Sequence, residues 1–467
     1  MGRKRRRRPA TPETPRWYEP ATVAVVSLGC AKNLTISEEI AARFGMSGYV
    51  LTPSTSGAEL VVVNTCGFIE PARRETRERI SELVKLKKKG LVGSIVVYGC
   101  MVQGFHEELQ AEFPDVDLWV GSTSSDRLFS LVRKGTCGTW LDTEWRRPGG
   151  KVLPRLYQTP PSFAYLKVSE GCDNRCAYCS IPRLRGPLRS LPTSAVLKEA
   201  VEIAESGRRE AVLVAQDLTA WGTDRGRREL PGLVEKMAAI EGLEWIRLLY
   251  MHPAGITDEI VEMFRSNPKV APYADVPLQH LDDGVLRSMG RPYDYERVLA
   301  LTAALREARP DMTIRTSIIV GYPTEGEAEF ARLLDRLDEL DLDRVGVFTY
   351  SRERETAAWK LGDPVPEEEK ERRRRAVMEL CEAKAEAHNA ARVGEETTLI
   401  VDTLAEDEDG PYCICRSPRE APEVDGVVYL DGEGEPGGMV RAVITGSDVH
   451  DLYAERLPGA GGEARKD

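Results

Sequence analysis

The stretch that most constrains this chain is Ser169–Ser180, which reads S-E-G-C-D-N-R-C-A-Y-C-S and follows an apolar run at Ala164–Val168. Its cysteines, Cys172, Cys176 and Cys179, have the spacing C-x3-C-x2-C. Three thiolates on one short loop can hold three corners of a cubane iron–sulfur cluster. A structural zinc site is the alternative, but it needs four protein ligands, and no nearby Cys or His supplies an obvious fourth. The spacing therefore favours a cluster with one open iron.

A second set of three cysteines lies closer to the N-terminus, each at the end of an apolar run. They are Cys30 after Val23–Leu28, Cys66 after Leu60–Val63, and Cys100 after Ser94–Tyr98. Helix-like stretches alternate with these runs, which predicts a parallel sheet covered on both faces. Because parallel strands end at one edge of a sheet, we expect the three cysteines to meet there and to hold a second cluster. Core packing is the alternative for any single cysteine, and Cys137, outside the triplet, is interpreted as a bystander.

Length and composition bound the class of protein. A chain of 467 residues is too long for one ordinary core, so several domains are expected. The sequence contains no run of about 18 apolar residues that could cross a membrane, and its N-terminus lacks the apolar stretch of a secretory signal. Ten cysteines, several in ligand spacing, favour a reducing compartment. We expect a cytoplasmic protein with no membrane partner.

The N-terminal arm is basic although the formal net charge of the chain is −11. Its six residues Arg3–Arg8 carry +6, which leaves −17 for the rest. A disordered, solvated arm, extended by prolines to residue 20, is the favoured interpretation. Contact with ribosomal or transfer RNA phosphates is the alternative.

Strand and helix patterns alternate six times between residues 158 and 392. The expected strands are Tyr165–Val168, Ala211–Ala215, Trp245–Tyr250, Asp275–Leu278, Thr313–Val320 and Arg344–Tyr350. Six units predict a partial (β/α)6 barrel, with its active site at the C-terminal ends of the strands. The loop that begins at Cys172 falls at that end of the first strand.

The last segment changes to short strands separated by Gly, Pro and Asp turns, which predicts a small antiparallel β-barrel. Glu395–Glu455 holds 16 acidic and 3 basic residues, which disfavours RNA phosphates and favours a basic protein partner, with solubility alone as the alternative. Cys413 and Cys415 share a strand face, but a lone pair of thiols does not make a metal site. We predict an α/β multidomain chain with an arm and linker at 1–20, an N-terminal α/β domain at 21–145, the barrel at 158–392, the β-barrel at 395–458 and a tail at 459–467.

These motifs resemble those of one enzyme family. The C-x3-C-x2-C loop resembles the radical S-adenosylmethionine (SAM) superfamily, whose open iron binds SAM. The stretches S-L-G-C-A-K-N (27–33), N-T-C-G-F-I (64–69) and Y-G-C (98–100) look like the N-terminal domain of the methylthiotransferases, although Ile36 stands where that family usually has an acidic residue. The final segment resembles a TRAM domain. The resemblance covers Val23 to Tyr453 and implies two [4Fe–4S] clusters, one on each cysteine triplet.

The stretch R-S-P-R-E-A-P-E-V-D-G-V-V-Y (416–429) is similar to that of the RimO branch, which modifies a ribosomal protein. I-P-R-L-R-G (181–186) and D-V-P-L-Q-H (275–280) also look like that branch. This resemblance implies addition of a CH3–S group to the β-carbon of an aspartate in small-subunit ribosomal protein number twelve. The alternatives are a transfer-RNA adenosine methylthiotransferase, a radical SAM enzyme of other chemistry, and a non-enzymatic ribosome-associated factor.

The resemblance also implies a division of chemistry between the clusters. The cluster on Cys172, Cys176 and Cys179 would reduce SAM to methionine and a 5′-deoxyadenosyl radical, which can remove hydrogen from an unactivated C–H bond. The cluster on the N-terminal triplet would carry the sulfur, which a second SAM methylates. An electron donor and a sulfur source are implied as partners, and no side-chain acid, base or nucleophile is expected.

Several residues at the strand ends are candidates for contacting SAM. Tyr178 precedes the last cysteine, where the family places a bulky residue beside the adenine. Gln216 and Asp217 end the second strand, and Gly321 and Pro323 end the fifth. A structural role in the barrel rim explains each of these residues about as well as a SAM contact does, because barrel rims need polar groups in any case. In the same rim, Thr324 and Gly326 depart from the family's G-x-P-G-E-T pattern, which makes Glu325 a weaker candidate, and His280 is interpreted as structural.

Overall fold

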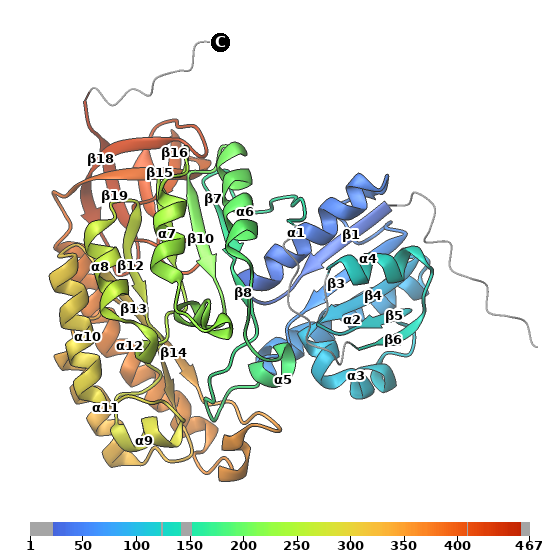
Figure 1. Ribbon diagram of the computed structural model, residues 1–467, viewed down its shortest axis with the longest axis horizontal. Helices are drawn as coiled ribbons and strands as arrows, with labels where there is room; N and C mark the ends of the chain where they lie inside the picture. Colours follow the sequence, from blue (N-terminus) through green and yellow to red (C-terminus); the bar gives the residue numbers. More distant parts are fainter. Residues whose placement is uncertain (1–21, 123–124, 142–151, 409, 459–467) are drawn as a thin grey trace, which may run out of the picture. The chain divides into compact units, whose positions relative to one another are not determined.

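The computed structural model describes residues 22–122, 125–141, 152–408 and 410–458 (Figure 1). These residues form two compact units. The first extends to residue 143 and includes Pro154–Leu156, and the second comprises the remainder. The predicted basic arm and the predicted C-terminal tail lie outside the described residues. No described helix is long and apolar enough to span a membrane.

The first unit is a six-stranded parallel sheet with helices on both faces. Its strands are β1 (Thr22–Ser27), β2 (Val50–Leu51), β3 (Leu60–Thr65), β4 (Ser94–Gly99), β5 (Leu118–Val120) and β6 (Gly138–Trp140), in the order β2-β1-β3-β4-β5-β6. Its helices are α1 (Ala31–Met46), α2 (Glu70–Lys88), α3 (Cys100–Glu112) and α4 (Ser125–Arg133). The predicted parallel sheet is confirmed, and β2, β5, β6, α3 and α4 are additional to the elements expected.

Alternation along the central strands explains why both faces are covered. Val61 and Val63 belong to a core that includes residues of α2 and α3, whereas Leu60 and Val62 belong to a second core that includes residues of α1 and α4. All residues of β3 are buried. A strand that is apolar on both faces is typical of a parallel sheet between two helical layers.

The second unit begins with six parallel strands in an open sheet. They are β7 (Phe163–Lys167), β10 (Glu210–Val214), β11 (Trp245–Leu248), β12 (Val270–Asp275), β13 (Thr313–Val320) and β14 (Arg344–Thr349), in the order β14-β13-β12-β11-β10-β7. The helices are α5 (Ile181–Arg185), α6 (Thr193–Glu205), α7 (Leu230–Ala238), α8 (Asp258–Ser266), α9 (Asp283–Ser288), α10 (Tyr295–Ala308), α11 (Glu327–Glu339) and α12 (Glu367–Ala390). The predicted partial (β/α)6 barrel is confirmed.

One expected strand was misplaced. The sequence pattern favoured Asp275–Leu278, but the fourth strand is Val270–Asp275, and the three residues that follow lead into the rim loop. Pro272 lies inside the observed strand, and proline is usually confined to strand edges and bulges. The register between β11 and β12 is indeed irregular, which accommodates it.

A closed β-barrel completes the second unit. Its strands are β15 (Glu396–Asp407), β16 (Gly410–Arg416), β17 (Val428–Asp431), β18 (Met439–Ser447) and β19 (Leu452–Arg456), in the order β15-β16-β17-β19-β18. The pairs are antiparallel, as predicted, except for β17 with β19, which is parallel. Cys413 and Cys415 belong to its apolar core. Figure 1 shows this barrel at one end of the strands of the (β/α)6 sheet.

The loop 416–425 joins the two barrels through buried charges. Arg416 is 1% exposed, and its guanidinium donates to Glu210 Oε2 at 2.6 Å and to both carboxylate oxygens of Asp402 at 2.7 and 2.9 Å. Glu210 begins β10 and also accepts from Arg247 Nε at 2.5 Å. Arg247 in turn donates to the carbonyl oxygen of Pro418 at 3.0 Å. The motif that resembles the RimO branch therefore lies partly in a buried junction at the N-terminal ends of the strands.

Replacing Arg416 with Met is expected to lower the free energy of unfolding of the second unit by about 3–5 kcal/mol, because it leaves Asp402 and Glu210 without this cation. Replacing Arg441 with Met removes an exposed pair with Glu396 in the same β-barrel and should cost less than about 1 kcal/mol. Urea unfolding followed by circular dichroism measures both changes. Equal losses would contradict the importance of the buried junction.

Candidate functional site

The cysteine loop of the second unit starts directly after β7. A short ribbon frames it, made of β8 (Ser169–Glu170) and β9 (Arg189–Ser190). Gly171 has φ +74°, and a Cβ atom there would lie 2.0 Å from the carbonyl oxygen of Pro187. Glycine is therefore required where the chain turns into the loop. All three cysteines of the loop are half-buried.

Hydrogen bonds attach this loop to the neighbouring strand ends. The backbone N–H of Asn174 donates to Cys172 Sγ at 3.4 Å, and its side-chain amide donates to Asp217 Oδ2 at 2.7 Å, just beyond β10. The backbone N–H of Ala177 donates to the carbonyl oxygen of Met289 at 2.7 Å. The thiols are thus placed by contacts with two other parts of the barrel rim.

Burial dominates the electrostatics of the loop. It raises the pKa of Cys172 and of Cys179 to about 12, so iron must displace protons when it binds there. Burial also acts to raise the pKa of Glu170, but Lys167 at 2.7 Å and Arg185 at 3.1 Å outweigh it and lower that pKa to about 2. The base of the loop therefore keeps a charged, paired carboxylate.

The segments that carry the other three cysteines are in contact at the carboxyl edge of β1, β3 and β4. A Cβ atom on Gly29, which precedes Cys30, would lie 3.1 Å from Cys66 Sγ. A Cβ atom on Gly67 would lie 3.1 Å from the carbonyl carbon of Cys100. These glycines are needed because the cysteine-bearing segments approach each other so closely.

Two asparagines of the sequence motifs hold this edge together. Asn33 Nδ2 donates to the carbonyl oxygens of Leu28 and Thr65 at 2.8 and 3.1 Å, and Asn64 Nδ2 donates to the carbonyl oxygen of Asn33 at 2.8 Å. Ile36, which departs from the family's acidic residue, is 5% exposed and packs in the core on the α1 side. The departure therefore serves packing and leaves the cysteine edge intact.

A cluster and a single-ion site make different demands on the thiolates. In a zinc site all thiolates share one ion at about 2.3 Å, whereas each thiolate of a cubane binds a different iron and stands further from the others. Within the described residues, no three Cys, His, Asp or Glu side chains converge to hold one metal ion. A cluster on each triplet stays a prediction.

Three candidate SAM contacts lie at the C-terminal rim, as expected: Gln216, Asp217 and Tyr178. They differ in whether their polar groups already have hydrogen-bond partners within the protein. Both carboxylate oxygens of Asp217 already accept hydrogen bonds, from Asn174 and from Thr219. The Oε1 atom of Gln216 is buried and has no hydrogen-bond partner among the described residues. Tyr178 packs against an apolar group that includes Met289. Gln216 is therefore the member of this set with an acceptor open to a ligand.

Gly321 and Pro323 occupy the loop after β13, where packing alone explains the glycine. Gly321 has φ +73°, and a Cβ atom there would lie 2.3 Å from Cγ of Lys370 in α12. Its N–H donates to Glu325 Oε1 at 2.8 Å. His280 Nδ1 accepts a backbone N–H, so its Nε2–H donates to Glu325 Oε2 at 3.0 Å, with both side chains buried. Glu325 and His280 are structural, and a SAM contact for Gly321 and Pro323 stays a prediction.

His252, after β11, is a rim residue that sequence reasoning missed. Its Nδ1 accepts the backbone N–H of Ala254 at 3.2 Å, so Nε2 carries the hydrogen. Within the part of the chain that the structure describes, this buried N–H has no hydrogen-bond partner. Burial and the nearby Arg291 lower the pKa of His252 to about 4, which keeps the ring neutral. The dipeptide H-P after a strand was the available signal. Together with Gln216 it provides one open donor and one open acceptor at adjacent strand ends.

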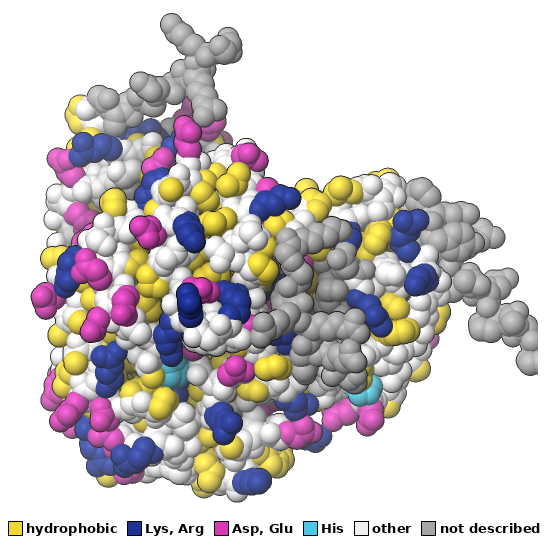
Figure 2. All heavy atoms as spheres, in the orientation of Figure 1, with side chains coloured by type: hydrophobic (Ala, Val, Ile, Leu, Met, Phe, Trp, Pro, Cys, Tyr) yellow, Lys and Arg dark blue, Asp and Glu magenta, His cyan; other side chains and the backbone are white. Residues whose placement is uncertain are grey.

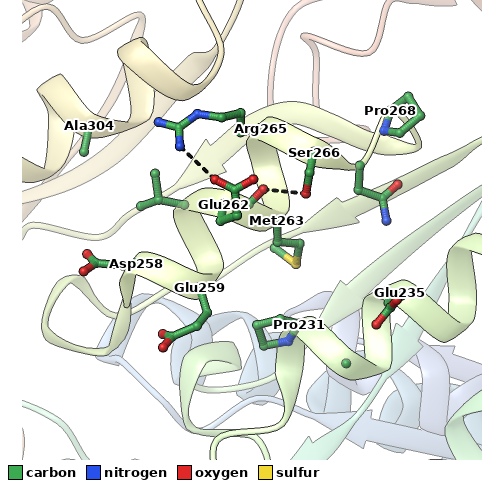
Figure 3. Close-up of a pocket in the computed structure, with 13 residues that line it drawn as sticks. Pro231, Glu235, Asp258, Glu259, Glu262, Met263, Arg265, Ser266, Pro268 and Ala304 are labelled. Atoms are coloured by element: carbon green, nitrogen blue, oxygen red, sulfur yellow. Dashed lines mark hydrogen bonds and ion pairs between the residues drawn. The ribbon is translucent and has the colours of Figure 1, made fainter.

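A surface hollow of about 870 Å³ lies elsewhere, among α7, α8 and α10 (Figure 3). Its carboxylates are Glu235, Asp258, Glu259 and Glu262, of which Glu262 pairs with Arg265 at 2.8 Å. None of the expected site residues lines it. The hollow is therefore separate from the strand-end loops.

Three segments of the chain match known families. Residues 22–121 match the uncharacterized protein family UPF0004, residues 166–337 the radical SAM superfamily, and residues 393–457 the TRAM domain. The ribosomal protein uS12 methylthiotransferase RimO of Trichlorobacter lovleyi is 40% identical over 443 residues, which cover 93% of this chain and 98% of the relative. The corresponding protein of Desulforudis audaxviator is 42% identical over 448 residues, covering 94% and 98%.

Solved structures with a similar fold have low sequence identity. The radical SAM methyltransferase TsrM from Kitasatospora setae, with cobalamin and a [4Fe–4S] cluster bound, aligns with a TM-score of 0.55 at 14% identity over 73% of this chain and 77% of its own. The cobalamin-dependent SAM radical enzyme OxsB aligns with a TM-score of 0.52 at 12% identity over 74% and 55%. At such identities the likeness shows the fold alone.

Replacing Cys172 with Ala is expected to halve the iron retained after anaerobic reconstitution, from about eight to about four atoms per chain. Cys66→Ala should have the same effect through the other triplet. Cys381→Ala is the matched control, because Cys381 lies in α12 and is buried in the apolar core. Iron and acid-labile sulfide assays measure the outcome. Full iron in both triplet variants would contradict the ligand assignment.

Proposed function

The chain belongs to the RimO family of ribosomal protein uS12 methylthiotransferases, and we propose that it adds a CH3–S group to the β-carbon of one aspartate of that protein. It is a transferase with a radical SAM domain and a TRAM domain. The observation that carries the proposal is the pair of cysteine triplets, each placed at the carboxyl ends of a separate parallel sheet. A non-enzymatic ribosome-associated factor would have no use for them.

We infer two [4Fe–4S] clusters, one on each triplet. When bound, they would supply the electron that cleaves SAM and the sulfur that a second SAM methylates. Oxidation of a thiolate-bound centre by air is a hazard, so it is favourable that Cys100 is buried and the other five cysteines are half-buried. An electron donor and a sulfur source are needed as partners.

In this scheme the side chains of the protein bind SAM and orient it. Gln216 Oε1 and His252 Nε2–H offer an acceptor and a neutral donor at the rim, suited to the amino, carboxylate or hydroxyl groups of SAM. Tyr178, next to the last cysteine, offers an aromatic surface at the same rim. No acid–base side chain is assigned to hydrogen removal, since the C–H bond is too weakly acidic for one near neutral pH.

The charge of the TRAM domain supports a protein substrate over transfer RNA. Glu395–Glu455 carries a net charge of −13, more negative than the −11 of the whole chain. Two of its three arginines, Arg416 and Arg419, are occupied in the junction with the barrel, which leaves Arg441 exposed. Figure 2 shows basic and acidic side chains interspersed over the face in view. Outside Glu395–Glu455 the formal net charge is +2, so the acidic excess of the chain belongs to that segment. Ribosomal proteins are basic, whereas phosphates would be repelled.

The direct test is anaerobic incubation of the reconstituted chain with SAM, a reductant, sulfide and two candidate substrates. One substrate is uS12 or its aspartate-containing loop peptide, and the other is an adenosine-bearing anticodon stem. We expect the mass of the peptide to rise by one CH2S unit and the RNA to stay unchanged. Cys30→Ala should abolish this product while still yielding 5′-deoxyadenosine, whereas Cys172→Ala should abolish both.

The control for these variants is Cys381→Ala, which should retain the activity of the parent. Modification of the RNA instead of the peptide would move the chain to the transfer-RNA branch. If SAM is cleaved but neither the peptide nor the RNA is modified, methylthio transfer to both substrates is contradicted. Contact of the arm at Arg3–Arg8 with ribosomal RNA is a separate proposal, tested by truncating residues 1–20 and measuring RNA affinity.

Reversing charge on the TRAM surface should weaken substrate binding. The double variant Glu433→Lys and Glu435→Lys is expected to raise the KM for uS12 severalfold with little change in kcat, and the difference should shrink at high salt. Glu259→Lys with Glu262→Lys makes the same charge change on α8 and is the matched control. An equal rise in KM for the control would show a general effect of net charge instead.

A further inference from the structure

The turn after α9 forms one wall of the cysteine loop. The carbonyl oxygen of Met289 accepts the N–H of Ala177 at 2.7 Å. A Cβ atom on Gly290, where φ is +70°, would lie 2.7 Å from the carbonyl oxygen of Arg175. Arg291 follows at once, so its side chain starts from backbone that is in direct contact with the loop.

Arg291 is 5% exposed and points its guanidinium at a cysteine of the triplet. Its Nη1 donates to Cys176 Sγ at 3.5 Å, its Nε donates to the hydroxyl of Tyr293 at 2.8 Å, and its Nη2 donates to the carbonyl oxygen of Pro277. The Tyr293 hydroxyl is itself held by the carbonyl oxygen of Leu278 at 2.7 Å. The direction of the guanidinium is therefore set by rigid partners.

Arg291 differs from three other buried arginines of the second unit in what surrounds its charge. Arg247, Arg373 and Arg416, which are also buried, each contact a carboxylate within 2.7 Å. In the described part of the chain no carboxylate is paired with Arg291, whose partners are a thiol, a hydroxyl and a carbonyl oxygen. A buried cation without a counter-anion is costly, so the geometry calls for an anion on the Cys176 side.

We propose that Arg291 is a positioning residue whose guanidinium donates a charge-assisted hydrogen bond to Cys176 Sγ and raises the reduction potential of the cluster held by Cys172, Cys176 and Cys179. The inference rests on the proposed function, because it requires that cluster. Hydrogen bonds to ligand sulfur and local charge both tune such potentials. Adding an electron makes the centre more negative, so a fixed cation nearby stabilises the reduced form more than the oxidised form.

The test is a one-electron reductive titration, followed by electron paramagnetic resonance, in the full chain carrying Cys30→Ala, Cys66→Ala and Cys100→Ala, so that one cluster is observed. Arg291→Met and Arg291→Gln are expected to lower the equilibrium constant for reduction at least tenfold, which is about 59 mV for one electron. Arg291→Lys keeps the charge, so its equilibrium constant for reduction should stay within about threefold of that of the parent. Arg287→Met removes an exposed arginine from α9 and should leave the potential unchanged.

A second readout uses the chain without iron. Arg291→Met removes hydrogen bonds but also a cation that lacks a counter-anion, so the apo variant should lose less melting temperature than apo Arg416→Met, which leaves two carboxylates unpaired. An equal or larger fall would show that the charge is already balanced and would overturn the proposal. Arg291→Gln serves the titration if Arg291→Met does not fold.

The remaining outcomes separate the two levels of inference. If the parent assembles no cluster by iron content, the proposed function and this inference both fail. If it assembles a cluster and Arg291→Met matches Arg287→Met in potential, only the role of Arg291 is overturned. A shift for Arg291→Lys as large as that for Arg291→Met would point to packing rather than charge and would also overturn it.

Discussion

In a parallel sheet every strand delivers its last residue to the same edge, and both candidate centres are built on that geometry. In the first unit β1, β3 and β4 bring three cysteine-bearing segments into contact, with Gly29 and Gly67 allowing the close approach. In the second unit the cysteine loop follows β7, and Gln216 and His252 follow β10 and β11 at the same rim. The helices and the second barrel stabilise the strands and leave this edge for chemistry.

Buried charge does different work at the two ends of the second unit. At the N-terminal ends of the strands Arg416 and Arg247 are matched by Glu210, so the TRAM domain is joined to the barrel by a balanced network. At the opposite ends no carboxylate of the described residues is paired with Arg291, which faces Cys176. The first arrangement is complete in the protein alone. The second becomes balanced when an anionic centre occupies the cysteine loop, which is why it bears on function.

Local patterns were sufficient for much of this protein. Apolar runs of four to eight residues alternating with helical stretches predicted both parallel sheets, because strand and helix periodicity is a property of neighbouring residues. They failed at Asp275–Leu278, because the observed strand is Val270–Asp275 and contains Pro272, a residue that is unusual inside a strand. They also suggested a cofactor contact for Gly321, whereas the close approach of Lys370 in α12 already explains that glycine.

By itself the sequence determined which chemistry the chain carries, since the spacing of six cysteines and the acidic excess of the last segment are properties of order and composition. Only the tertiary structure decided which polar groups are satisfied and which remain open. Arg291 and Cys176 are 115 residues apart, and Arg416 and Glu210 are 206 apart, so no local pattern could pair them. Burial makes such pairings matter, because a charge removed from water must find its partner within the protein or in what the protein binds.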